Sequence, residues 1–199
     1  MLEMPKQRGF KQERILRILL NHAGAELSKY RIAKEGAVSE EWVLEYTARL
    51  EAAGMLRGTA VKKPRDLYEE WLDVRVQPNQ LAVSFQRPME VLEESRLDYA
   101  LTTYRAENLL QGFLFPSTTD FYIRPEQRQG WLDLVEDRGL LGGGNTRIRI
   151  TDEHVFYNNR SVQGQPTVST PQLIVDLLDE GGPCEEAAEK LIETFHGTE

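Results

Sequence analysis

The sequence predicts an α+β protein in which an N-terminal winged helix-turn-helix is followed by a small mixed α/β domain. Capping residues and amphipathic stripes mark three helices before position 54, and a basic, β-prone stretch follows them up to position 63. Strand-like and helical segments then alternate along the chain. We therefore expect a winged-helix domain at 1–65 and an α/β domain at 66–199, with a linker helix at about 66–75.

The first two helices are short and have one apolar face each. Residues 1–11 are polar and basic, and we expect them to form a frayed tail. From Gln12 to Asn21 the apolar residues recur on one side of a helix. A second helix is expected from about Leu27 to Lys34, and its basic side chains must face water or a partner because they cannot be buried alone.

The third helix has the clearest limits. Ser39 is a natural N-cap, because its hydroxyl can accept a backbone N–H, and the two glutamates after it suit the positive end of the helix dipole. Gly54 supplies the left-handed residue that ends the helix. Trp42 has a spacing typical of core residues, and an exposed anchor for a partner is the alternative. The basic stretch Thr59–Lys63 is the expected wing, which Pro64 interrupts.

The sequence of the second domain predicts a small sheet with helices packed on it. Strands are expected at 81–85, 120–124, 147–151, 155–157 and 166–168. Helices are expected after Pro88, over 104–111, over 125–137, after the cap Thr170 and after Pro183.

The charge of the chain is divided unevenly. The formal net charge is -8, which at first argues against nucleic acid. Residues 1–67, however, contain 13 Lys or Arg and 9 Asp or Glu, a net of +4, while residues 68–199 contain 11 and 23, a net of -12. This division favours one domain that binds double-stranded DNA and a second domain that binds a protein or a second subunit, giving a homodimer.

The basic residues lie where a winged helix holds phosphates rather than where it reads bases. The third helix carries Glu40, Glu41 and Glu45, and carboxylates repel phosphates, so base contacts should be sparse. We predict phosphate contacts from the second helix, the end of the third helix and the wing. The candidate DNA-binding residues are Lys29, Arg31, Lys34, Ser39, Trp42, Arg49, Arg57, Lys62 and Lys63.

Two other functions stay open from these residues. The cations could be solvated charges on a winged-helix adaptor that binds protein without DNA. Alternatively, the chain could be a degenerate nucleotidyltransferase, because the segment 117–123 has some likeness to the acidic strand of those enzymes. Tyr122 replaces the second carboxylate there, so we expect Asp120 to be a solvated acid at a strand edge and the protein not to be an enzyme.

Several classes of site and location are disfavoured. Gly142–Asn145 runs into a strand without the Gly-Lys-Ser/Thr of a phosphate-binding loop. His154 beside Asp152 and Glu153 could suggest a metal site, but neighbours in a strand point to opposite faces. His22 and His196 have no ligand-spaced partners, so we expect no catalytic residue, metal or cofactor. The single Cys184 allows no internal disulfide, and no apolar run is long enough for a membrane helix. We expect a cytoplasmic protein with no membrane partner.

The C-terminal stretch Val168–Leu191 resembles the end of AbiEi-type antitoxins of type IV toxin-antitoxin systems, in which an Asp-Leu pair precedes Gly-Gly and a Glu-Ala-Ala helix. The order of the chain agrees with that resemblance in its winged helix, in Leu67–Trp71, in Tyr99–Thr102 and in Pro116–Tyr122. The resemblance implies a repressor of its own operon that also neutralises a nucleotidyltransferase-like toxin. In the family an Arg usually follows Gly-Gly, whereas Pro183 and Cys184 stand here.

Overall fold

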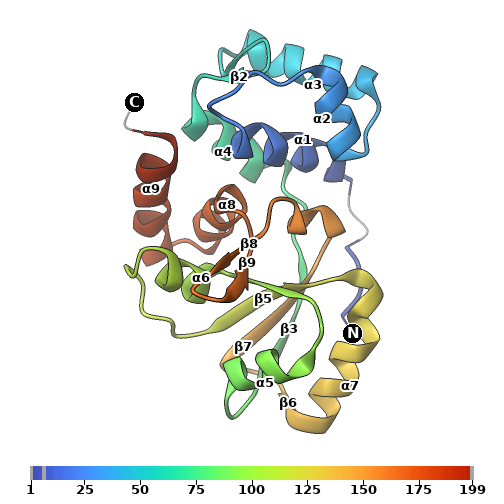
Figure 1. Ribbon diagram of the computed structural model, residues 1–199, viewed down its shortest axis with the longest axis vertical. Helices are drawn as coiled ribbons and strands as arrows, with labels where there is room; N and C mark the ends of the chain where they lie inside the picture. The colour runs from blue at the N-terminus through green and yellow to red at the C-terminus, as the bar shows by residue number, and fades with distance from the viewer. Residues whose placement is uncertain (1, 6–7, 198–199) are drawn as a thin grey trace.

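Helix α1 (Phe10–Asn21) lies at the centre of the N-terminal part of the structure. The computed structural model describes residues 2–5 and 8–197. The apolar side chains of α1 from Ile15 to Leu20 are fully buried, and the helix packs on α2 (Lys29–Gly36), α4 (Pro64–Val74) and α8 (Thr170–Glu180). Helices α1 to α4 form a helical layer at one end of the molecule, above the sheet (Figure 1).

Local signals set the limits of α2 and α3 (Glu40–Ala52). Ser28 caps α2 and Ser39 caps α3, each hydroxyl accepting a backbone N–H of its first turn, at 3.2 and 3.3 Å. Gly54 has a φ of 77°, and the backbone N–H of Met55 donates to the carbonyl of Leu50 at 3.0 Å. This is a Schellman-type end, so the predicted start and stop of the third helix are confirmed.

A short antiparallel hairpin follows α3, made of β1 (Leu56–Arg57) and β2 (Ala60–Val61). The hydroxyl of Thr59 donates to the carbonyl of Leu27 at 2.5 Å, and the Gly58 N–H donates to the Glu51 carboxylate at 2.7 Å. These two bonds hold the hairpin against α2 and α3. Three helices and a hairpin thus occur in the predicted order, with a hairpin of only two residues per strand.

A mixed sheet forms the other layer. Within the described residues it has seven strands in the order β6-β3-β7-β5-β4-β9-β8. β5 lies in the middle, parallel to β7 and antiparallel to β4. The strands are β3 (Asn79–Ser84), β4 (Tyr99–Thr102), β5 (Thr119–Ile123), β6 (Leu140–Leu141), β7 (Thr146–Ile150), β8 (Arg160–Val162) and β9 (Gln165–Thr167).

Helices cover this sheet and connect it to the helical layer. They are α5 (Pro88–Ser95), α6 (Thr103–Leu110), α7 (Arg128–Arg138), α8 and α9 (Pro183–His196), with 3-10 turns at Pro125–Gln127 and Glu153–Phe156. The hydroxyl of Ser169, not the predicted Thr170, caps α8. Helix α8 contacts α1, α4, α6 and α9, so it lies between the two layers (Figure 1). The mixed α+β class is confirmed.

The predicted strand at 155–157 is wrong, because this segment is a 3-10 turn that contacts the helical layer. The Val155 N–H donates to the Asp152 carbonyl at 3.0 Å, which closes the turn. His154 stacks on Tyr157 at 4.9 Å between ring centroids, and its Nε2 lies 3.2 Å from the Glu35 carbonyl. These contacts with α2 turn the segment away from the sheet.

The predicted frayed tail is also wrong where the structure describes it. Leu2 is 1% exposed, and its carbonyl accepts a hydrogen bond from Arg128 at 3.0 Å. The carbonyl of Glu3 accepts one from Asn79 at 2.7 Å. Lys11 belongs to α1, while positions 1, 6 and 7 lie outside the described residues.

Asp120 is buried, which corrects its prediction as a solvated acid at a strand edge. It is fully buried on the central strand β5. The Nε of Arg147 donates to it at 2.8 Å, and Thr103 also donates to it. Arg147 and Arg149 bind Glu180 as well, at 2.8 and 3.3 Å. Both oxygens of Asp120 are therefore occupied by groups that hold the sheet against α6 and α8.

A second buried network joins the two layers through Asp176 of α8. Its carboxylate accepts hydrogen bonds from Arg75 at 2.5 Å, from Gln172 at 2.9 Å and from Tyr122 at 3.0 Å. Burial opposes the charge of Asp176, but Arg75 and Arg149 outweigh burial and lower its pKa below the usual range. The carboxylate is therefore charged and fully partnered inside the protein.

The same network continues into α1. Arg17 is buried and donates to Gln172 at 2.8 Å and to Glu13 at 3.3 Å. The Glu13 carboxylate also accepts from the Trp71 indole at 3.3 Å and from the Val76 N–H at 2.5 Å. Polar bonds thus run from α1 through α8 to the sheet.

We expect Asp176→Ala to destabilise the fold by about 3–5 kcal/mol, because it removes the carboxylate that lies 2.5 Å from the buried Arg75 guanidinium and leaves only the more distant Asp179, at 3.4 Å. Urea unfolding followed by circular dichroism measures this change. Asp98→Ala removes an exposed partner of Arg124 and should cost less than about 1 kcal/mol. An Asp176→Ala protein as stable as Asp98→Ala would contradict the importance of this network.

Mild acid should weaken the fold through two buried histidines. Burial, with Arg17 nearby, lowers the pKa of His154 to about 3, and burial lowers that of His196 to about 4. The unfolded chain takes up these protons near the ordinary imidazole pKa of 6.5, so this stability is complete above pH 6.5 and is lost as the pH falls toward the pKa values of the folded protein.

The free energy of unfolding should therefore fall between about pH 7 and pH 5, by on the order of 1 kcal/mol for each histidine, and the urea midpoint should fall with it. The fall should be shallower in His154→Gln and in His196→Gln than in the unchanged protein. An equally steep fall in both variants would show that these histidines do not control the acid sensitivity.

Candidate nucleic-acid interface

Helix α2 presents three of the predicted cations. Lys34 and Arg31 are exposed, and Lys29 is half-buried at the first turn. Arg31 donates to Glu35, four residues later, at 2.6 Å. An exposed ion pair of this kind contributes little to the free energy of folding, so Arg31 can leave Glu35 and bind a phosphate at small cost.

Helix α3 has an acidic and apolar outer face. Glu41, Leu44 and Glu45 are exposed, Leu44 by 53%. The predicted Ser39 has its hydroxyl engaged as the N-cap. Arg49 binds Glu70 at 2.8 Å and lies over the ring of Tyr46 at 4.8 Å. This face therefore offers few donors to base edges or phosphates.

Trp42 is on the surface, so its expected place in the core is wrong. The buried residues of α3 begin with Val43 and recur as Tyr46, Thr47 and Leu50. Trp42 lies one position before this stripe and is 37% exposed. The Lys11 ammonium lies 5.2 Å from the centre of its ring, which is a cation–π distance.

Two cavities lie beside predicted DNA-binding residues. One has a volume of about 410 Å³ and is lined in part by Lys62, and the other has a volume of about 610 Å³ and is lined in part by Trp42. This Trp42 pocket, of about 610 Å³, is lined by Arg8, Gly9, Phe10, Lys11, Gln12, Arg14, Ala37 and Trp42. Arg14 is committed to Asp152, with bonds of 2.5 and 2.6 Å. Arg8 and Lys11 have no such carboxylate within the described chain. The pocket therefore combines an aromatic ring with two available positive charges.

Sequence reasoning missed Arg8 and Lys11 because it assigned them to a tail. Helix α1 starts at Phe10, and its N-cap Gly9 makes no side-chain capping bond. The usual signal for a helix start is therefore absent at this position. The apolar stripe does not supply a signal either, because Phe10 lies five residues before Ile15 and so falls outside that stripe.

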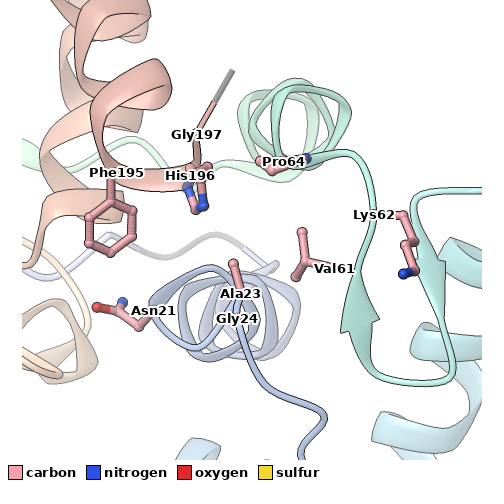
Figure 2. Close-up of a pocket in the computed structure, with 9 residues that line it drawn as sticks. All are labelled: Asn21, Ala23, Gly24, Val61, Lys62, Pro64, Phe195, His196 and Gly197. Carbon is pink, nitrogen blue, oxygen red and sulfur yellow. The ribbon is translucent and has the colours of Figure 1, made fainter. Parts of the chain in front are cut away.

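The remaining predicted DNA-binding residues lie on the hairpin or just after it. Arg57 and Lys62 are exposed, and Lys63 pairs with Asp66 at 3.2 Å. Figure 2 shows Lys62 on the hairpin side of the smaller pocket, of about 410 Å³, with Phe195 and His196 on the side of α9. At the turn, Gly58 lies beside the carboxylates of Glu26 and Glu51. The tip itself is therefore acidic, and its cations flank the tip.

The cations of the chain separate into paired and available ones. Arg75 at the end of α4 and Arg149 on β7 have buried guanidinium groups, Arg147 on β7 is half-buried, and all three are held by carboxylates. In the part of the helical layer that the structure describes, several exposed or half-buried cations have no ion-pair partner. These are Arg8, Lys11, Lys29, Lys34, Arg57 and Lys62. Arg96, Arg105, Arg128 and Arg160 also form no ion pair with a described residue, but they lie in the part of the chain that carries a net charge of -12. The positive charge that can meet a ligand is thus densest on the helices and hairpin of residues 8–62.

Other chemistry finds little support in the described residues. No group of three or more His, Cys, Asp or Glu among them is arranged to hold a metal ion. No helix there is long and apolar enough to cross a membrane. Asp120 is enclosed by arginines, and burial raises the pKa of the Cys184 thiol. Neither group is placed as an accessible acid or nucleophile.

Comparison with known proteins adds no family to this geometry. No protein-family model, no curated protein and no solved structure matched the chain. The resemblance to AbiEi-type antitoxins therefore stays a prediction that rests on the sequence motifs alone.

Proposed function

We propose that α1 to α3 and the hairpin form a winged helix-turn-helix that binds double-stranded DNA, and that the protein is a transcriptional regulator without chemistry of its own. The concentration of available cations on residues 8–62 is the observation that carries this proposal. Such a surface attracts the phosphate backbone and gains free energy by releasing counterions. The acidic remainder of the chain would be repelled by the same backbone.

Phosphates are the expected contact because of what α3 presents. Its exposed Glu41 and Glu45 oppose deep insertion into a groove, whereas Lys29 and Lys34 on α2 and Lys62 beside the hairpin can each neutralise a phosphate. Arg8 and Lys11 add a further contact at the Trp42 pocket. Discrimination between sequences would then depend mainly on the shape and deformability of the duplex.

The family resemblance extends this proposal. It implies an autorepressor that also neutralises a nucleotidyltransferase-like toxin, and a homodimer on an inverted repeat would double the phosphate contacts. The acidic C-terminal domain is the surface proposed for the toxin. Pro183 and Cys184 replace the usual Arg of the family, so any contact made by that Arg is missing here.

A protein-binding adaptor is the second candidate, and one observation favours it. Tyr30 on α2 and Leu44 on α3 are exposed by 62% and 53%, as side chains of a protein interface often are. The two functions differ in their response to salt, because phosphate contacts weaken steeply as salt is added. Binding to duplex DNA at different salt concentrations therefore separates them.

The triple variant Lys11→Glu, Lys34→Glu, Lys62→Glu should weaken duplex binding at least about ten-fold. The slope of log affinity against log salt concentration should also become shallower by roughly two to three, because each phosphate contact contributes about 0.9 to that slope. Fluorescence anisotropy with labelled DNA from upstream of the gene measures both quantities.

A matched control separates local contacts from net charge. Arg87→Glu, Arg96→Glu, Arg138→Glu makes the same change in charge on exposed residues at the N-cap of α5, at its C-cap and in α7, and it should change affinity much less. If the control weakens binding as strongly as the triple variant, the proposed interface is wrong. If the unchanged protein shows no binding at low salt, the adaptor is favoured.

Acrylamide quenching should report contact at Trp42. Trp71 and Trp131 are fully buried, so the accessible indole fluorescence comes from Trp42. Duplex DNA should reduce the quenching constant by about half or more, because stacking or coverage of the ring excludes the quencher. The Trp42→Phe protein should show no such change, and unchanged quenching in the unmodified protein at saturating DNA would place the interface elsewhere.

A further inference from the structure

A groove lies between α4 and α9, on a part of the surface that the proposed DNA interface does not use. This α4–α9 groove has a volume of about 560 Å³. Its apolar lining comes from Tyr68, Leu72, Leu178 and Ile192, and its polar rim comes from Arg65, Glu69, Glu185, Glu186 and Glu189. Leu72 and Leu178 are only half-buried, so the groove leaves apolar surface in contact with water.

The rim is strongly acidic, and part of its charge has no counterion. Glu189 pairs with Arg65, and Glu186 pairs with Lys190 at 3.0 Å. Glu69 on α4 and Glu185 on α9 form no ion pair with any described residue. Four carboxylates therefore face one groove that contains a single lining cation.

Helix stability explains only some of these carboxylates. Glu185 and Glu186 lie in the first turn of α9, where negative charge favours the helix dipole. Glu69 lies in the middle of α4, where this effect is absent, and its side chain is exposed at the groove. Apolar lining and acidic rim together define a surface complementary to a segment that has the opposite charge and its own apolar side chains.

We propose that the α4–α9 groove binds a partner protein through an amphipathic helix that carries Lys or Arg beside its apolar face. The apolar side chains of that helix would cover Leu72 and Leu178, and its cations would pair with Glu69 and Glu185. Nucleic acid and anionic lipid are poor occupants, because the carboxylates repel their phosphates. The available cations of a second copy lie on α1, on α2 and beside the hairpin, which is a different patch from the groove. Such a heterologous contact generates rings or open chains and not a simple dimer, so a different protein is the better occupant.

A synthetic helical peptide with leucine on one face and lysine on the other tests the groove directly. The fluorescently labelled peptide should bind the full-length protein saturably, and Glu69→Lys, Glu185→Lys should weaken that binding at least about ten-fold. Hydrogen exchange should show the peptide protecting amides of α4 and α9. A peptide with serine in place of leucine should bind at least about ten-fold more weakly, because it cannot cover the apolar lining.

Control measurements decide whether binding is local. Glu136→Lys, Asp137→Lys makes the same charge change at exposed positions of α7 and should leave peptide affinity within about two-fold. The proposal fails if this control weakens binding equally, if the serine peptide binds as well, or if no saturable binding occurs. It also fails if Glu69→Lys, Glu185→Lys abolishes self-association in sedimentation, since the occupant would then be a second copy. DNA titrations with the same variants test the proposed function separately.

Discussion

The buried charge of Asp176 is the constraint on which the arrangement of the two layers depends. A carboxylate inside a protein is tolerated only if cations and hydrogen-bond donors satisfy it. Here the donors are Arg75 at the C-terminal end of α4, Gln172 on α8 and Tyr122 on β5. These groups can meet only when the helical layer lies in one position on α8. The network therefore sets the orientation of the layers as well as contributing to their stability.

This constraint also determines which charges the surface retains. The arginines that neutralise buried carboxylates, such as Arg17 and Arg147, are withdrawn from any ligand. Most of the cations that stay available belong to positions that the interior does not need, at the start of α1, on α2 and around the hairpin. Ion pairing inside the sheet layer thus adds to the charge division that the sequence already carries, because it occupies Arg147 and Arg149.

The sequence predicted features that depend on neighbours in the chain. Ser39 and Gly54 act locally, so the limits of α3 follow from them, and Pro183 likewise opens α9. Features that depend on distant contacts were missed. Whether Asp120 lies at an edge or in the centre is decided by the order of the strands, and periodicity does not contain that order.

In the candidate nucleic-acid interface, too, features that depend on distant contacts could not be predicted from the sequence. The interface residues on α2 and the hairpin follow from composition and helix limits, but Lys11 acquires its role only by lying over Trp42. The segment 153–156 could alternate like a strand, yet contacts of His154 and Tyr157 with Glu35 make it a turn. The proposed division at position 65 stays a prediction, although buried bonds cross it.

The attachment of the hairpin affects how it could select a ligand. Thr59 binds it to the segment just before α2 and Gly58 binds it to α3, so it is not a free arm that can adapt its shape. A pre-set arm loses little conformational entropy when it engages, which favours fast and reversible association. It also cannot follow a surface of the wrong width, so rigidity itself would reject poorly matched partners.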